Sequence, residues 1–143
     1  MPQIERTTLV PYSCQQMFDL VNDIPSYPEF VPGCADANLL HQEADRIDAE
    51  LVISKAGIQQ RFATRNRLTA PHRIDMELLR GPFKSLRGGW TFEAMDENAC
   101  KISFKLDFEF SSRMLQFAFG KIFNEITRRQ VDAFAQRAKV VYG

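Results

Sequence analysis

An unbroken alternation of apolar and polar residues in the last third of the chain most constrains the fold. The apolar positions are Cys100, Ile102, Phe104, Leu106, Phe108 and Phe110, and the positions between them are Lys101, Ser103, Lys105, Asp107 and Glu109. Because successive side chains of a β-strand point to opposite faces, this segment predicts a strand with one covered and one solvated face. The same period recurs in residues 46–54, 58–68, 73–78 and 90–94, which is typical of an antiparallel sheet.

Two short helices are expected between the first strand and the rest of the sheet. Residues 4–10 read as a first strand. Ser13 and Gln16 then form a capping-box pattern, which predicts a helix over about residues 14–21. Ser26 can cap a second, very short helix shortly before the sheet resumes.

The C-terminal segment predicts one long amphipathic helix over roughly residues 112–140. At 100° per residue, one side of this helix carries Leu115, Phe119, Ile122, Phe123, Ile126, Ala133, Phe134 and Val141. Such a stripe must cover an apolar surface, and the inner face of the sheet is the available one. Within the sheet, Gly88 and Gly89 interrupt a strand pattern and predict a β-bulge.

These patterns predict an α+β fold with a single domain over residues 1–143. A curved antiparallel sheet of about six to seven strands would wrap around the long C-terminal helix, with two short helices after the first strand. Hydrophobic residues make up 45% of the chain and charged residues 25%, so a substantial core can form without disulfide or metal staples. A sheet that grips a helix in this way tends to enclose a cavity.

The cellular compartment follows from what the sequence lacks. The first residues contain no apolar signal-peptide core, and no apolar run approaches the ~18 residues of a membrane span. Cys14, Cys34 and Cys100 are odd in number and widely spaced, which matches neither a disulfide framework nor a zinc site. We expect them to pack as small hydrophobes in a cytoplasmic protein.

The sequence shows no catalytic apparatus. Gly-rich phosphate-binding motifs, the zinc-protease motif and the serine-hydrolase motif are absent. His41 and His72 stand at predicted strand ends in polar context, and Asp107 and Glu109 share the solvated face of their strand. We therefore expect a protein that is not an enzyme, with no catalytic residues, no metal site and no cofactor other than a bound ligand.

Basic residues gather in the middle of the chain although the net charge is zero. Residues 55–90 carry eight basic and two acidic groups, a net of +6, whereas residues 1–54 carry two basic and nine acidic groups, a net of −7. The candidate RNA-binding residues are Lys55, Arg61, Arg65, Arg67, Arg80, Lys84 and Arg87. Arg61, Arg65 and Arg67 share the outward parity of one strand and could hold RNA phosphates without reading bases. The alternative is a solvated face whose arginines pair with acids of residues 1–54; no DNA partner is expected.

A few polar residues fall on otherwise apolar faces. Thr64 and Asn66 share the inward parity of Phe62, and Gln130 lies in the covered stripe of the helix. They either pair with the backbone and each other or bind the polar head group of a ligand in an apolar pocket. The candidate ligand-binding residues are Phe30, Val31, Phe62, Thr64, Asn66, Met76, Leu78, Trp90, Phe92, Phe104, Phe108, Phe117, Phe119, Phe123 and Gln130.

Two groups of apolar residues predict the mouth of this pocket. Phe30 and Val31 lie in the second short helix, and Met114 and Phe117 lie off the covered stripe of the long helix. If both groups frame one opening, a lipid could enter there during transient contact with a membrane surface. Ordinary packing of Phe30 and Val31 against the first helix is the alternative.

Several segments together resemble the START-like, coenzyme-Q-binding family of the helix-grip superfamily. They are residues 10–13, 27–34, 81–86, 89–92, 106–110, 119–123 and 133–138. Within this family, residues 54–58 and the pair Phe119-Gly120 are most similar to bacterial ribosome-association toxins.

The resemblance implies two non-enzymatic functions. One is binding of a polyprenyl quinone such as ubiquinone, or a related lipid, in the cavity to support respiration. The other is binding of the large ribosomal subunit, which prevents subunit association and blocks translation initiation. Because some members of the superfamily are cyclases or hydrolases, an enzyme of that kind is a further alternative.

Overall fold

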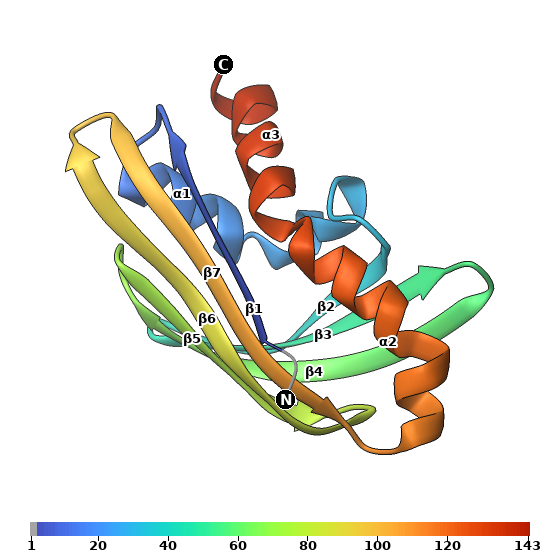
Figure 1. The fold of residues 1–143 in the computed structure, drawn as a ribbon. Coiled ribbons are helices and arrows are strands. Elements are labelled where there is room, and N and C mark those ends of the chain that lie inside the picture. Colours follow the sequence, from blue (N-terminus) through green and yellow to red (C-terminus); the bar gives the residue numbers. More distant parts are fainter. Residues whose placement is uncertain (1–2) are drawn as a thin grey trace.

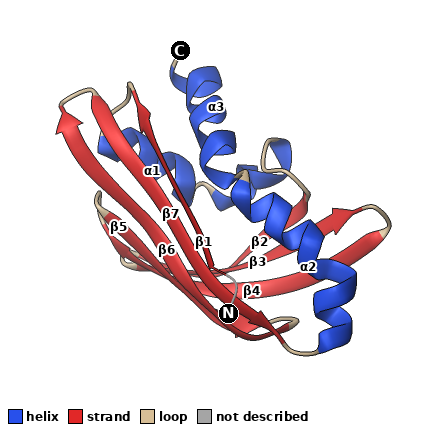
Figure 2. Cartoon of the chain, viewed as in Figure 1, coloured by secondary structure: helices blue, strands red, loops and turns tan. Residues whose placement is uncertain are grey.

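The computed structural model describes residues 3–143, which form a curved seven-stranded antiparallel sheet with helices on its concave side (Figure 1, Figure 2). The strands are β1 (Gln3–Val10), β2 (Cys34–Glu43), β3 (Arg46–Lys55), β4 (Ile58–Thr69), β5 (Arg73–Arg80), β6 (Phe83–Asp96) and β7 (Ala99–Phe110). Their order in the sheet is β1-β7-β6-β5-β4-β3-β2, so β2 to β7 form a meander and β1 lies at the edge beside β7. The α+β, START-like helix-grip fold predicted from the sequence is confirmed.

The helices are α1 (Cys14–Asn22), the 3-10 helix η1 (Ile24–Glu29), α2 (Arg113–Arg128) and α3 (Gln130–Tyr142). At the start of α1 the predicted capping box is present. The hydroxyl of Ser13 accepts a hydrogen bond from the backbone N–H of Gln16 at 3.1 Å, and the Gln16 side chain accepts one from the N–H of Ser13 at 2.9 Å.

The predicted cap of the second short helix is wrong. Helix η1 begins at Ile24, so Ser26 lies inside it and its hydroxyl donates to the Asp23 carboxylate at 2.6 Å. Pro25 occupies the first turn, where its fixed φ suits a helix and its missing N–H costs nothing. This proline therefore moves the helix start ahead of the serine.

The prediction of one continuous C-terminal helix is also wrong, because α2 and α3 meet in a bend at Arg129 (Figure 1). The hydroxyl of Thr127 donates to the carbonyl oxygens of Phe123 at 2.8 Å and Asn124 at 3.1 Å. A threonine that bonds back to the preceding turn bends a helix. The N–H of Arg129 then reaches the carbonyl oxygen of Ile126, three residues back, and the regular ladder is interrupted.

The bend changes which residues of the last helix are buried. Val131, Phe134 and Ala138 are buried in α3, whereas Val141, assigned to the covered stripe by a single straight helix, is 49% exposed. The covered face of α3 is thus rotated relative to an uninterrupted continuation of α2.

The glycine pair in β6 marks close backbone approach, and the predicted bulge at this position is wrong. The register of β6 with β7 is continuous through Gly88 and Gly89, and its irregularities lie nearer the two ends of β6. A Cβ atom on Gly88 would lie 2.0 Å from the carbonyl oxygen of Lys105, and one on Gly89 would lie 1.9 Å from that of Ile74. Both neighbouring strands therefore press against β6 where only glycine fits.

The core lies on the inner face of the sheet, and aromatic rings fill the part of the core beneath α2. The alternating apolar residues of β7 are all buried, as predicted. Beneath α2, ring centroids lie 4.9–6.3 Å apart in a cluster made of Phe83, Phe108, Phe110, Phe119 and Phe123. Because this cluster packs the space under α2, the apolar interior cavity lies farther along, toward α3.

Candidate ligand cavity and outer charged face

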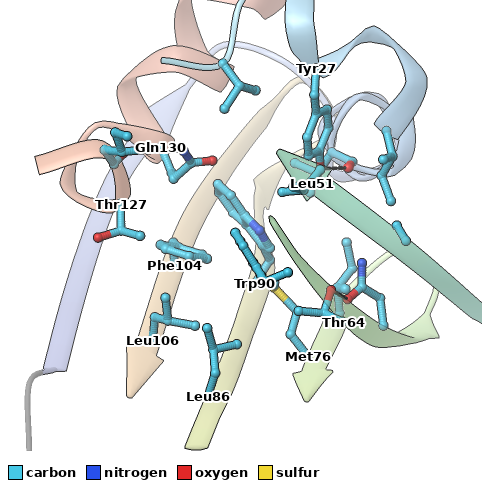
Figure 3. Close-up of a pocket in the computed structure, with 18 of the residues that line it drawn as sticks. Tyr27, Leu51, Thr64, Met76, Leu86, Trp90, Phe104, Leu106, Thr127 and Gln130 are labelled. Carbon is cyan, nitrogen blue, oxygen red and sulfur yellow. Dashed lines mark hydrogen bonds between the residues drawn. The ribbon is translucent and has the colours of Figure 1, made fainter. Parts of the chain in front are cut away.

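An apolar cavity lies between the sheet and the helices, near the bend that joins α2 to α3 (Figure 3). Its lining residues are Val21, Asn22, Ile24, Tyr27, Val31, Ala49, Leu51, Ile53, Phe62, Thr64, Asn66, Ile74, Met76, Leu86, Trp90, Phe104, Leu106, Phe123, Ile126, Thr127 and Gln130. Its volume is about 70 Å³, counted as the space open to the centre of a water molecule. That is room for a few waters or a small ligand fragment, and a prenyl chain would require the walls to move.

The predicted polar residues reach this cavity. The hydroxyl of Thr64 donates to the side-chain oxygen of Asn66 at 3.0 Å, and the Gln130 amide donates to the carbonyl oxygen of Ile126 at 3.3 Å. These contacts realise the alternative in which the buried polar groups pair with each other and with the backbone. They also place fixed dipoles at two points of an otherwise apolar wall, which is the usual composition of a small-molecule site.

Nine of the fifteen predicted ligand-binding residues line the cavity: Val31, Phe62, Thr64, Asn66, Met76, Trp90, Phe104, Phe123 and Gln130. The other six do not: Phe30, Leu78, Phe92, Phe108, Phe117 and Phe119. Strand parity predicts which side chains point to the inner face of the sheet. It does not predict which of them lie at the level of the cavity and which lie beyond it. Phe108 and Phe119 accordingly belong to the aromatic cluster, and Phe92 packs against Phe18 of α1 with ring centroids 5.7 Å apart.

Tyr27 is a lining residue that the sequence analysis missed. Its hydroxyl donates a hydrogen bond to the carbonyl oxygen of Val21, and burial raises its pKa well above the ordinary value. The phenol therefore stays protonated and holds η1 against the end of α1. The spacing of three between Ile24 and Tyr27, which places both on one face of a 3-10 helix, is the signal that could have identified it.

The structure does not bring together the two groups predicted to frame one mouth. Phe30 packs on Tyr27 and on Phe134 of α3, with the Arg137 guanidinium 4.9 Å above its ring. Met114 and Phe117 belong to the first turns of α2, at the other end of the helical pair (Figure 1). Phe30 thus packs on η1 and α3, and not against the first helix as the alternative predicted, while Val31 lines the cavity.

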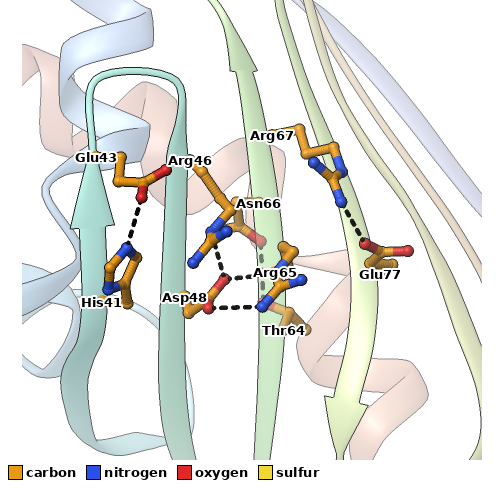
Figure 4. A network of polar contacts seen from close by, with 9 residues as sticks. All are labelled: His41, Glu43, Arg46, Asp48, Thr64, Arg65, Asn66, Arg67 and Glu77. Atoms are coloured by element: carbon orange, nitrogen blue, oxygen red, sulfur yellow. Dashed lines mark hydrogen bonds and ion pairs between the residues drawn. The ribbon is translucent and has the colours of Figure 1, made fainter.

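Three arginines of the outer sheet face are held by two buried carboxylates of β3, and Figure 4 shows one of these contacts, between Arg65 and Asp48. The side chains of Asp48 and Glu50 are only 8% exposed. Arg65 donates to both Asp48 oxygens at 3.0 and 3.1 Å, while Arg61 and Arg80 each donate to one Glu50 oxygen at 2.7 Å. The guanidinium groups hold the pKa of both carboxyls below the ordinary range. The predicted alternative, pairing with acids of residues 1–54, describes these three arginines.

Opposite charges also alternate from strand to strand across this face. The strand register places in one row Asp48, Arg65, Glu77, Arg87 and Asp107. Arg67 contacts Glu77 at 3.4 Å, and Lys55 contacts Glu125 of α2 at 3.2 Å. Among residues 3–143, Lys84 and Arg87 form no salt bridge. Most of the predicted basic surface is therefore neutralised by its own neighbours.

The cavity offers little for acid–base or metal chemistry. Among the described residues that line it, Tyr27 is the sole titratable side chain, and its proton is committed to Val21. No cluster of His, Cys, Asp or Glu suited to a metal ion occurs between residues 3 and 143. Within the same residues, none of the helices combines the length and hydropathy needed to cross a membrane.

Comparison with known proteins gives four findings. The family model described as "Polyketide cyclase / dehydrase and lipid transport" matches residues 10–135. A "Ribosome association toxin RatA" of Vibrio cholerae serotype O1 is 53% identical over 143 residues, which covers all of this chain and 99% of that protein. A mitochondrial "Coenzyme Q-binding protein COQ10 homolog B" of Xenopus laevis is 26% identical over 136 residues, covering 92% of this chain and 56% of that protein. A START superfamily protein from Mycobacterium smegmatis has the same fold, with a TM-score of 0.81, 17% identity, and coverage of 97% of this chain and 98% of that one.

Proposed function

This chain belongs to the polyketide cyclase/dehydrase and lipid transport family, and from this premise we propose that it is a non-enzymatic ribosome-association protein. It binds the large ribosomal subunit in the cytoplasm, prevents association of the subunits and thereby blocks translation initiation. The observation that carries the proposal is the 53% identity over the whole length to a relative named for ribosome association. The lack of a free acid or base in the cavity supports binding over catalysis.

Subunit association tests this function directly. Purified chain is added to separated ribosomal subunits before the magnesium concentration is raised, and the mixture is resolved on a sucrose gradient. We expect the peak of joined ribosomes to fall and the chain to sediment with large subunits, not with small subunits alone. Binding should weaken as salt rises, because phosphate contacts release counterions. Full subunit joining at a molar excess of the chain would overturn the proposal.

A second function, binding of a hydrophobic ligand such as a polyprenyl quinone, is favoured by a separate observation. The cavity has an apolar wall with the Thr64–Asn66 pair at one point and Gln130 at another, which suits an apolar ring carrying carbonyl groups. The name of the Xenopus relative supports the same chemistry at a lower identity. Because the cavity is small, binding of a ligand with a prenyl chain would require the walls of the cavity to move.

Native mass spectrometry tests this second function. Protein purified without detergent should carry a mass increment that organic extraction removes and that matches a quinone or another isoprenoid lipid. Protein that remains ligand-free, and takes up no ubiquinone analogue with a short side chain, would contradict quinone binding. The two functions are not exclusive, since one uses the interior and the other the surface.

A further inference from the structure

Among the described residues, the most exposed large apolar side chains lie together on the first two turns of α2. Phe117 is 91% exposed and Met114 is 81% exposed. A phenylalanine so open to water on a regular helix contributes nothing to the core. Grouped exposed apolar residues mark contact sites.

Cations flank Phe117 along the same face of the helix. Arg113, Phe117 and Lys121 are spaced by four residues, so they form one row, and the backbone positions of the two cations lie about 12 Å apart along the helix axis at 1.5 Å per residue. Neither cation forms a salt bridge within residues 3–143. The one acid of α2, Glu125, is already bound to Lys55 at 3.2 Å and Arg129 at 3.3 Å. This row therefore presents two cations without a salt bridge among the described residues, and the electrostatic interaction of Lys121 with Glu125, one turn further along, is shared with Lys55 and Arg129.

A groove runs beside this row, between α2 and the sheet edge at β1 and β7. Its lining residues are Gln3, Phe108, Phe110, Gln116, Gly120, Lys121, Asn124 and Arg128. Amide side chains and two cations form its walls, and aromatic residues contribute to its base. Gly120 contributes no side chain to the groove, and a Cβ there would lie 3.5 Å from the ring of Phe110 and 3.7 Å from the side chain of Gln116.

We infer that this groove and the Arg113–Phe117–Lys121 row are the docking surface for RNA of the large ribosomal subunit. The inference rests on the proposed ribosome association. An unstacked base stacks on Phe117, phosphates lie against Arg113, Lys121 and Arg128, and the amides of the groove meet polar edges of the RNA. Stacking on aromatic rings beside a cationic groove is the general mode of binding to unpaired RNA.

The chemistry of the surface favours RNA over a membrane. Insertion into a lipid interface needs an extended apolar face, and this site exposes two large apolar side chains beside a groove walled by amides and cations. The outer sheet face is a poorer RNA site, because Asp48 and Glu50 already occupy the guanidinium groups of Arg65, Arg61 and Arg80.

Matched charge reversals test the location. Arg113→Glu/Lys121→Glu changes the charge by four units on α2, and Lys101→Glu/Lys105→Glu makes the same change on the outer face of β7, where neither lysine forms a salt bridge among the described residues. With the full chain and purified large subunits, we expect at least ten-fold weaker co-sedimentation for the α2 variant and an unchanged affinity for the β7 variant. Phe117→Ala should weaken binding roughly ten-fold without changing the net charge. Equal losses from both reversals, or no loss from Phe117→Ala, would overturn the location.

A photoreactive benzoylphenylalanine in place of Phe117 tests the occupant. Irradiation of the complex should attach the chain to RNA of the large subunit, and attachment to a ribosomal protein instead would overturn RNA as the occupant. Vesicles of phosphatidylethanolamine and phosphatidylglycerol provide the membrane arm: vesicle binding that depends on Phe117, with ribosome binding intact in Phe117→Ala, would also overturn it. If the wild-type chain fails to bind large subunits at all, the proposed function falls, and this inference falls with it.

Discussion

At the scale of single residues, the buried carboxylates of β3 show how a basic segment can be structural. Glu50 lies between Arg61 and Arg80, and Asp48 binds Arg65 through two parallel hydrogen bonds. A buried carboxylate is tolerated only when hydrogen-bonded cations compensate its lost hydration. The arginines of β4 and β5 are thus needed to keep these acids in the sheet.

Removing the charge of Glu50 should destabilise the fold. Glu50→Gln leaves two guanidinium groups facing one neutral amide, and we expect the free energy of unfolding at pH 7 to fall by about 1–3 kcal/mol, between the values for exposed and buried ion pairs. Because the folded-state pKa of Glu50 is lowered, its contribution is present above the ordinary value of 4.5 and is lost as the pH falls below it. Urea titrations at several pH values should show the gap between wild type and variant closing in acid. Glu97→Gln, in an exposed turn, is the control; a gap independent of pH would contradict the electrostatic origin.

The polar pair in the cavity allows a second test by a double-mutant cycle. Thr64→Val leaves the side-chain oxygen of Asn66 without its donor, and we expect a loss of roughly 1–3 kcal/mol in the free energy of unfolding. Thr64→Val/Asn66→Leu removes both polar groups and should recover part of that loss. Chemical denaturation of the two single variants and the double variant provides the measurement. A double variant as unstable as the sum of the single variants would mean that the two side chains act independently.

At the scale of elements, the backbones of the neighbouring strands lie so close to β6 that Gly88 and Gly89 leave no room for a side chain. For Gly88→Ala we expect a loss of at least about 2 kcal/mol, because the new Cβ would lie 2.0 Å from a carbonyl oxygen of β7. Gly120→Ala in α2 is the control: its Cβ meets nothing closer than 3.5 Å, so it should be neutral or stabilise by up to about 1 kcal/mol. Thermal unfolding of both variants measures the difference. An unaffected Gly88→Ala protein would show that β6 can move away from β7.

The elements were largely predictable from sequence, and the exceptions have local causes. Strands β3, β4, β5 and β7 and the second half of β6 follow from alternation, and α1 follows from its capping box, because both signals reside in neighbouring residues. Strand β2 carries no alternation, since its buried residues are Cys34 and Ala37, and it was not predicted. The break at Arg129 was missed since a helical projection assumes an unbroken ladder, whereas the hydroxyl of Thr127 competes for carbonyl oxygens of the preceding turn. The β-bulge at Gly88 and Gly89 was wrongly predicted for a related reason. The close approach of β5 and β7 to β6 cannot be inferred from the sequence of β6 alone.

At the scale of the whole molecule, the fold separates an interior site from an exterior one. The inward orientation of Thr64 and Asn66 was predictable from strand parity. The position of each aromatic ring along the sheet was not, so the sequence could not show which rings form the aromatic cluster and which line the cavity. Likewise, parity placed Arg61 and Arg65 outward without giving the register that pairs them with β3. The groove beside α2 joins Gln3 to Arg128, which no local pattern connects.

This separation leads to a prediction that distinguishes the two proposed functions. Ala49 lines the cavity from β3, and Ala49→Leu adds three carbon atoms to a space of about 70 Å³. Filling a small apolar void changes stability little or improves it by up to about 2 kcal/mol, so the variant should remain folded. We expect it to lose uptake of a quinone analogue, measured by native mass spectrometry, and to keep its affinity for large ribosomal subunits. Ala44→Leu, in the exposed turn between β2 and β3, is the matched control and should retain both. If Ala49→Leu also loses ribosome binding while its unfolding temperature is unchanged, the cavity and the α2 surface are coupled, and occupancy of the interior would then regulate docking at the exterior.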